Sequence, residues 1–309
     1  LLTVLLSLAI VVAIPDTGVA AAKKKERKKK GAEQTEAPQP AKKEDSGALK
    51  PYTEIISKDA VSSFGLFDVH LVKDKYYFEI PDSLLGRDIL LVNRKHKAPA
   101  DYNKQTVGYP GDMLGEEVLR FERGPQNKMF LRSISYLEQA TDTAGLYTAV
   151  QNSNVQAIVG AFDVKTHRTD TLGAVVSYVF EVTDYIKGDK GVFGFTNRNK
   201  KNMGLASLTA EASYIDTVKV FPGNVEVRSV KTYARVQDTG PGAMYAPETP
   251  LTYELNTSLV LLPDVPMKPR LFDPRVAYFA VRYTDFDSNP QGVERRSKIT
   301  RWRLEPREE

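Results

Sequence analysis

The sequence predicts a mainly β protein in which antiparallel sheets form a sandwich or an open barrel, with a few short helices. Two observations lead to this class. Apolar and polar residues alternate over many short segments, which is the pattern of half-buried strands. Short links that contain Gly, Pro or Asp separate these segments, as is typical of strands joined by turns.

The first predicted elements lie between residues 51 and 95. A short helix is expected at 51–61. The next two strands are joined by a short polar link, 72–75, and therefore predict a hairpin. Asp82 or Ser83 could cap a helical turn before the third strand. The strands predicted here are 67–71, 76–80 and 87–95.

A loop rich in Gly and Pro, 98–115, is interpreted as a domain boundary. Beyond it, Gly124-Pro125 predicts a hairpin turn, and 143–154 is the best helix candidate. The strands predicted here are 116–123, 127–138, 155–165, 174–182, 213–221, 224–236, 251–262, 276–286 and 296–305.

These elements divide the folded part into a small α+β hairpin domain at 51–97 and a β-rich domain at 98–295. Residues 296–309 are expected to begin a connection to a further domain.

The N-terminal 50 residues predict export. The apolar run and small residues of 1–22 are typical of a secretory signal peptide that lacks its start; an N-terminal membrane anchor is the alternative. Residues 23–50, with ten Lys/Arg and five Asp/Glu, predict a disordered basic linker. The linker carries a net charge of +5 and residues 1–22 carry −1, so residues 51–309 have no net charge although the whole chain has +4. The linker favours a tether, or contact with an anionic membrane surface, over nucleic-acid binding. The expected location is the periplasm, the cell envelope or the medium.

Composition limits the chemistry of this chain. With no Cys among its 309 residues it has no disulfides or thiolate ligands, and it has three His. His70 is expected on the outward side of its strand, as a surface or edge histidine, and His167 in a polar turn within reach of Asp170. The sequence contains no H-E-x-x-H, G-x-S-x-G or phosphate-loop motif. We therefore predict no catalytic, cofactor-binding or metal-binding residue here. The fifteen Tyr leave a carbohydrate-binding face open.

The stretch DFDSNPQG, 285–292, spaces three oxygen-bearing side chains as a calcium loop does at its start. An EF-hand loop requires Gly at its sixth position and Glu at its twelfth. Those positions are Pro290 and Arg296 here. The stretch is therefore interpreted as a strand-connecting turn, with calcium as the less favoured alternative.

Six segments carry a resemblance to a known family: 65–94, 118–133, 159–165, 254–263, 267–287 and 297–306. They resemble the region that precedes the catalytic domain in certain exported bacterial zinc-dependent metalloproteases. The resemblance implies that zinc is held by an H-E-x-x-H-x-x-G-x-x-H motif in a domain that would follow Glu309. No zinc ligand or catalytic residue can be carried over to this chain, and the parent protein is expected to be the zinc peptidase.

The resemblance implies an accessory role, in which the chain supports the folding or substrate access of a C-terminal metalloprotease domain and meets its peptide substrate. Arg270, Asp273 and Arg275, near Asp285 and Asp287, are the expected site of an interdomain polar contact; alternatively they pair among themselves at a turn. A second hypothesis is a stand-alone cell-envelope module that binds peptide or glycan on a β face. The missing motifs argue against an independent hydrolase.

Overall fold

The structure is a computed structural model. It describes residues 49–100, 104–140, 145–236, 249–286, 288–289 and 291–303. The predicted signal peptide, almost all of the predicted linker and Asp287 lie outside the described residues. No helix in the described part of the chain is long and apolar enough to cross a membrane.

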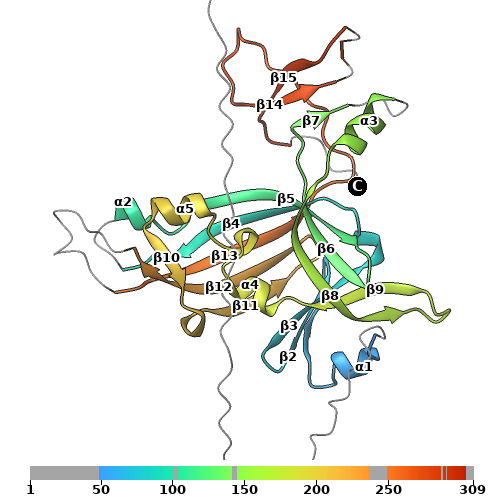
Figure 1. The fold of residues 1–309 in the computed structure, drawn as a ribbon, viewed down its shortest axis with the longest axis vertical. Coiled ribbons are helices and arrows are strands. Elements are labelled where there is room, and N and C mark those ends of the chain that lie inside the picture. Colours follow the sequence, from blue (N-terminus) through green and yellow to red (C-terminus); the bar gives the residue numbers. More distant parts are fainter. Residues whose placement is uncertain are drawn as a thin grey trace, which may run out of the picture. The chain divides into compact units, whose positions relative to one another are not determined.

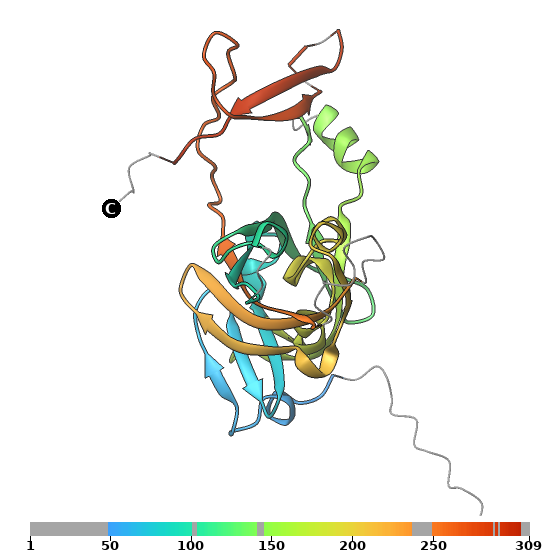
Figure 2. The same cartoon turned by 90° about the vertical axis from the view of Figure 1, so that its left-hand side faces the viewer.

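Twelve strands form one large antiparallel sheet. They are β1 (Val61–Ser63), β2 (Asp68–Val72), β3 (Lys75–Pro81), β4 (Ile89–Lys97), β5 (Met113–Arg123), β6 (Lys128–Ser133), β8 (Ala157–Thr169), β9 (Val175–Glu181), β10 (Leu205–Leu208), β11 (Tyr214–Val220), β12 (Asn224–Arg235) and β13 (Leu251–Leu261). The order is β1-β2-β3-β9-β8-β6-β5-β4-β13-β12-β10, and β11 also pairs with β12. The sheet curls until it is nearly closed into a barrel (Figures 1 and 2). The mainly β prediction is confirmed, in its open-barrel form.

The two edges of this sheet meet at one point. The backbone N–H of Leu66, which precedes β2, donates to the carbonyl of Phe221, which follows β11, at 2.8 Å. Gly65 packs so tightly there that an added Cβ would lie 2.6 Å from the Phe221 oxygen. A glycine is therefore required where the two edges approach each other.

The strands of the two predicted domains share this sheet. Strand β3 pairs with β9, and β4 pairs with both β5 and β13. Strand β8 pairs with β6 through its first half and with β9 through its second half. The segments 51–97 and 98–295 therefore contribute to one continuous hydrogen-bonded ladder.

Aromatic side chains fill the larger core of the barrel. Phe78 and Phe180 are cross-strand partners on β3 and β9, with ring centroids 6.4 Å apart. Each also contacts further aromatic side chains, at centroid distances of 4.9 to 6.0 Å. These further rings are Phe67, Phe121 and Phe162. Tyr233 and Tyr253 belong to a second, smaller core. Rings at these separations add favourable edge-to-face and stacked contacts to the burial of apolar area.

Short helices complete the unit. They are α1 (Tyr52–Ile55), α2 (Lys104–Val107), α3 (Leu146–Ser153), α4 (Thr183–Lys187) and α5 (Asn197–Asn202), with the 3-10 turns η1 (Asp82–Leu84), η2 (Gly191–Phe193) and η3 (Ala210–Ala212). The predicted helix at 143–154 is confirmed in α3, whereas the helix expected at 51–61 ends at Ile55. The sequence patterns do not predict α4, η2 or α5, although Ile186 and Phe193 from this segment enter the larger core.

A separate three-stranded sheet has the order β15-β14-β7. Its strands are β7 (Glu138–Gln139), β14 (Ala280–Asp285) and β15 (Glu294–Ile299). The predicted strand 127–138 is confirmed as far as Ser133, where β6 ends; it is wrong for 134–137, and Glu138 begins the separate strand β7. Because β14 and β15 pair antiparallel, the stretch DFDSNPQG connects two strands. Its side chains bind nearby backbone: Asn289 Oδ1 accepts the N–H of Gln291 at 2.9 Å, and Asp285 Oδ1 accepts that of Ser288 at 3.3 Å.

Candidate functional site

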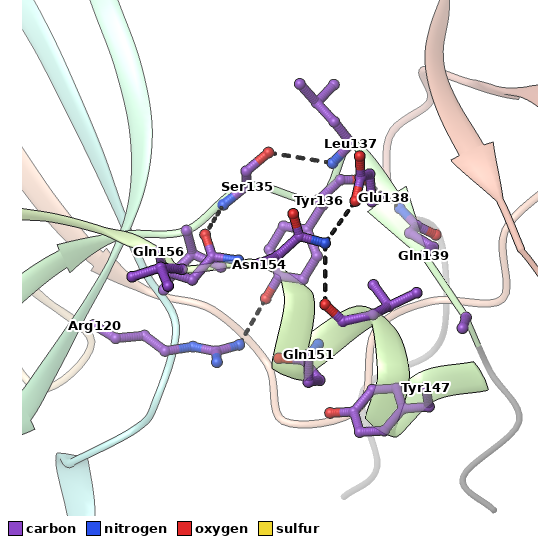
Figure 3. A pocket seen from close by; sticks show the side chains of 14 residues that line it. Arg120, Ser135, Tyr136, Leu137, Glu138, Gln139, Tyr147, Gln151, Asn154 and Gln156 are labelled. Carbon is purple, nitrogen blue, oxygen red and sulfur yellow. Dashed lines mark hydrogen bonds between the residues drawn. The ribbon is translucent and has the colours of Figure 1, made fainter. Parts of the chain in front are cut away.

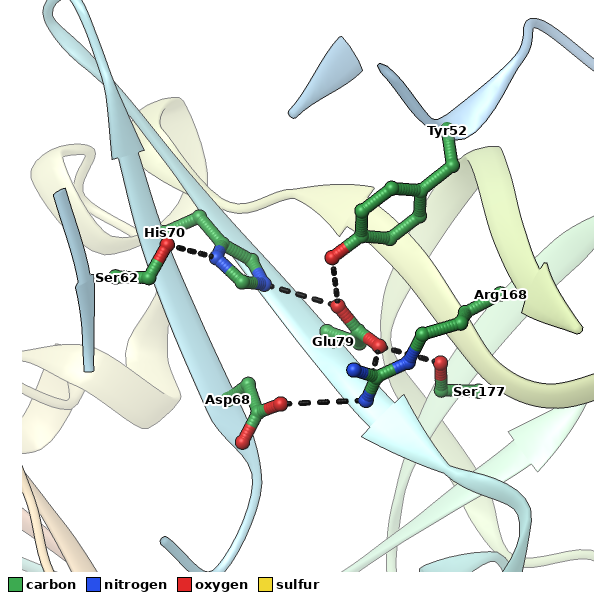
Figure 4. A network of polar contacts seen from close by, with 7 residues as sticks. All are labelled: Tyr52, Ser62, Asp68, His70, Glu79, Arg168 and Ser177. Carbon is green, nitrogen blue, oxygen red and sulfur yellow. Dashed lines mark hydrogen bonds and ion pairs between the residues drawn. The ribbon is translucent and has the colours of Figure 1, made fainter. Parts of the chain in front are cut away.

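A polar cluster of seven side chains in the described part of the chain is built around Glu79 (Figure 4). In β3, Phe78 and Ile80 point into the larger core, so Glu79 lies on the outer face of the sheet. Helix α1 and strand β1 belong to the N-terminal segment on this side, and the Glu79 side chain is only 1% exposed. A carboxylate at this depth requires partners for both oxygens.

Four donors bind the Glu79 carboxylate. Oε2 accepts from Tyr52 Oη at 2.7 Å and from His70 Nε2 at 2.9 Å. Oε1 accepts from the Ser177 hydroxyl at 2.5 Å and from Arg168 Nη2 at 2.7 Å. Arg168 also pairs with Asp68 at 3.3 Å. The donors come from α1, β2, β8 and β9, so the cluster joins segments that are far apart along the chain.

These contacts control the ionisation of Glu79. Burial by itself raises the pKa of the carboxyl, but the hydrogen bonds from His70, Ser177 and Tyr52 and the charge of Arg168 lower it, and the net result is a pKa of about 2. Burial, and then the bond to Glu79, raises the pKa of Tyr52. Glu79 is therefore a carboxylate, and Tyr52 a neutral donor, at neutral pH.

The prediction that His70 faces solvent is wrong, because its side chain is 2% exposed. Alternation correctly separates it from the core face, but other elements cover the outer face of β2. The Ser62 hydroxyl from β1 lies 2.7 Å from Nδ1, and the Phe64 ring contacts the imidazole edge-on. Nε2 carries the hydrogen that Glu79 accepts, since a carboxylate can only accept.

Ser62, His70 and Glu79 present a hydroxyl, an imidazole and a carboxylate in series. The same groups in series activate the nucleophile in serine hydrolases. Here each oxygen of Glu79 already accepts two hydrogen bonds, so the carboxylate is saturated by structural partners. This saturation supports a structural role, in which the cluster fastens the N-terminal segment to the outer face of the sheet.

The other two histidines take no part in this cluster. His167 lies within β8 and not in a turn, so that part of the prediction is wrong. Asp170, its expected partner, accepts the backbone N–H groups of Leu172 and Ala174, each at 2.9 Å. His96 Nε2 lies 3.6 Å from Glu254.

A buried lysine occupies the barrel interior, where sequence patterns do not single out a site. Lys231 lies on β12 between Val227 of the larger core and Tyr233 of the smaller one, and it is fully buried. Its Nζ donates to the Gly188 carbonyl at 2.5 Å. Burial lowers the pKa of Lys231 to about 8, although nearby Asp189 opposes this shift.

A pocket of about 440 Å³ lies beside β7 and α3 (Figure 3). It is lined by Arg120, Ile134, Ser135, Tyr136, Leu137, Glu138, Gln139, Ala140, Tyr147, Val150, Gln151, Asn154, Val155 and Gln156. Arg120 Nη2 donates to the Tyr136 hydroxyl at 2.9 Å, and both side chains bind Asp88. Asn154 Nδ2 donates to Glu138 Oε2 at 2.6 Å. In this β7–α3 pocket Arg120 is therefore paired with a carboxylate, whereas Glu138 has a neutral amide as its hydrogen-bond partner.

The residues predicted for an interdomain contact lie on or near the three-stranded sheet. Arg275 pairs with Asp273, with Nη2 to Oδ2 at 2.6 Å, and both are close in sequence at a turn. The Arg270 carbonyl accepts the N–H of Ile299 at 3.0 Å. Asp285 is buried and lies 3.5 Å from Arg296. Asp273 and Arg275 thus form a local ion pair, and Asp285 contacts β15 through Arg296.

The same region exposes an unusual number of large apolar side chains, which we call the C-terminal apolar surface. Its members are Leu271, Phe272, Val276, Tyr278, Phe279, Val281, Val293 and Trp302. Phe279 is 90% exposed and Trp302 86% exposed. Among the described residues after Val265, Tyr283 is the one large hydrophobic side chain that is buried.

Across the described ranges no group of three or more His, Asp or Glu side chains is arranged to hold a metal ion.

The fold and these sites define a mainly β chain with a nearly closed antiparallel barrel, a buried carboxylate cluster and an exposed apolar surface. The chain belongs to the family of the domain of unknown function DUF5117, whose model matches residues 111–307. A second model, the domain of unknown function DUF5118, matches residues 49–98. Neither description names an activity, a substrate or a metal. Comparisons with curated proteins and with solved structures give no match.

Proposed function

We propose that this chain is the non-catalytic N-terminal region of an exported zinc-dependent metalloprotease, and that it packs against the catalytic domain of the same protein. The zinc and the residues that activate water belong to that domain. The barrel supports the folding of the catalytic domain and the access of polypeptide substrates to it. Two features support this proposal. They are the resemblance of several segments to such proteases and the small sheet near the C-terminus.

The C-terminal apolar surface is the observation that carries the proposal. A three-stranded sheet with a single large buried hydrophobic side chain has no core of its own, and such sheets need a covering layer to be stable. Scattered exposed apolar residues are ordinary, but eight within one short segment exceed that expectation. A protein domain that covers Phe279 and Trp302 would remove their rings from water, which is the main source of affinity in protein interfaces.

Charge in the same segment indicates the chemistry of the covering domain. Residues 265–303 contain nine Lys or Arg and four Asp or Glu, a net charge of +5, whereas residues 51–309 together are neutral. A complementary surface on the catalytic domain would therefore be apolar at its centre and acidic at its rim. The expected polar contact through Arg270 and Arg275 fits that rim.

The test uses the complete protein, expressed from its gene together with any domain that follows residue 309. We expect bound zinc, hydrolysis of casein, and loss of both on chelation. Replacing Phe279 and Trp302 with serine should lower the hydrolysis rate by about tenfold or more, because each ring is a candidate hot spot worth about 2 kcal/mol.

The matched control replaces Val61 and Leu172, two exposed apolar residues of the barrel sheet and its turns, with serine. That variant should keep the full rate. A complete protein without zinc-dependent proteolysis would overturn the proposal, and so would a Phe279/Trp302 variant as active as the control.

A further inference from the structure

The β7–α3 pocket lies along an edge of the three-stranded sheet that no other strand of the described residues covers. Every residue that lines it is either Arg120 or a member of the segments 134–140 and 147–156, and none belongs to β14 or β15. Since β7 is the terminal strand in the order β15-β14-β7, the pocket occupies the side of β7 that faces away from β14.

Backbone hydrogen bonds show which groups of β7 face the pocket. The N–H groups of Thr284 and Phe286 donate to the carbonyls of Leu137 at 2.7 Å and Gln139 at 3.0 Å. Successive residues of a strand direct their backbone groups to opposite edges. The N–H and C=O of Glu138 therefore point away from β14, toward the side of the strand on which the pocket lies. A strand edge with free backbone groups is a template for another extended segment.

Side chains around this edge also have unused hydrogen-bonding groups. Within the described part of the chain, the Tyr147 hydroxyl and the Gln151 amide form no hydrogen bond, and both belong to α3 on the wall opposite Glu138 (Figure 3). The Gln156 amide uses its oxygen, which accepts the N–H of Ser135 at 2.8 Å. Exposed Leu137 and Val155 supply apolar rims. These groups suit a ligand with amide donors, amide acceptors and small apolar side chains.

We propose that the β7–α3 pocket binds an extended, uncharged stretch of polypeptide, which adds to the free edge of β7 as a further strand of the small sheet. Arg120 is already paired with the Asp88 carboxylate, so no anionic group on the ligand is required, and the Glu138 carboxylate already accepts a hydrogen bond from the Asn154 amide. Free amides and a tyrosine could also bind sugar hydroxyls, but the open backbone edge favours a peptide. The proposal stands apart from the covering of the C-terminal apolar surface, since it concerns binding by this chain alone.

The test measures binding to the 309-residue chain by fluorescence anisotropy. The probe is a fluorescein-labelled octapeptide of alternating valine and threonine, and the comparison probe is the same peptide N-methylated at its four central residues. Saturable binding of the first probe is expected, with affinity about tenfold weaker for the second, because N-methylation removes backbone donors and leaves the side chains unchanged.

Variants locate the site. Tyr147→Ala and Gln151→Ala should each weaken binding about three- to tenfold, while Tyr109→Ala, which removes an exposed tyrosine outside the pocket, should leave it unchanged. Glu138→Pro should abolish binding, and Glu138→Ala should retain most of it, since only the former removes the backbone N–H.

Three results would overturn the proposal: no saturable binding of the octapeptide, equal affinity for its N-methylated form, or binding of a chitin oligosaccharide without binding of the peptide. The last result would assign the pocket to a glycan. The comparison of the two peptides needs no variant, so it decides the matter even where a substitution prevents folding.

Discussion

Replacement of Glu79 by glutamine tests the carboxylate cluster directly. A carboxyl pKa lowered from 4.5 to about 2 means that the ionised side chain contributes about 3 kcal/mol to stability at neutral pH. Glutamine removes the charge and turns an NH₂ group toward His70, Ser177 or Arg168, all of which are donors. We therefore expect Glu79→Gln to lower the free energy of unfolding at pH 7 by about 2 to 4 kcal/mol.

The pH dependence gives a second, independent readout. Because the folded pKa lies below the unfolded one, the contribution of Glu79 is complete above pH 4.5 and is lost as the pH falls toward 2. The wild-type chain should lose that stability over this range, and the Glu79→Gln chain should lose correspondingly less.

Urea unfolding followed by far-UV circular dichroism measures both effects. The single tryptophan, Trp302, is exposed on the C-terminal apolar surface and does not report on the barrel. Glu116→Gln is the matched control, because Glu116 is an exposed carboxylate on β5. Surface substitutions usually change the free energy of unfolding by no more than about 0.5 kcal/mol. If the free energies of unfolding of Glu79→Gln and Glu116→Gln differ by less than this, the role assigned to Glu79 is refuted. An unchanged loss of stability at acid pH in Glu79→Gln would also refute it.

Two further predictions concern the barrel. The lowered pKa of Lys231 means that the unfolded chain binds one more proton than the folded chain between about pH 8 and 10.5, so stability should rise over this range; Lys231→Met should abolish this rise in urea titrations, and a persistent rise would contradict the assignment. Gly65→Ala should lower the unfolding free energy by about 1 to 3 kcal/mol, because its Cβ would press on the Phe221 backbone. Gly223→Ala, whose Cβ meets no neighbour within 4 Å, is the control, and equal melting temperatures for the two variants would disprove the tight closure.

Most of the sheet could be predicted because each strand carries its own signal. In β13, buried Leu251, Tyr253 and Leu255 alternate with less buried neighbours, so the sequence indicates both the strand and its inward face. The turn between β14 and β15 is equally local, since Asn289 binds the backbone two residues later. By contrast, α4, η2 and α5 are too short to show a helical period, and Phe193 is buried only because the barrel surrounds it.

The candidate sites depend on contacts that no local pattern contains. Glu79 lies between the core residues Phe78 and Ile80 of its strand, and only the pairing of β3 with β9 brings Ser177 near it. The β7–α3 pocket requires that β7 be the last strand of its sheet. A two-residue strand gives no periodic signal that would predict this.

The sequence by itself determined the mainly β class, the main strands, the hairpin turns and the absence of thiol chemistry. Tertiary structure alone decided which polar side chains are buried, which strand edge is open and which apolar residues are exposed. The physical reason is that alternation distinguishes the two faces of a strand, whereas the burial of each face depends on the segment that covers it. His70 illustrates this, because it lies on the face that alternation assigns to it and is nevertheless buried.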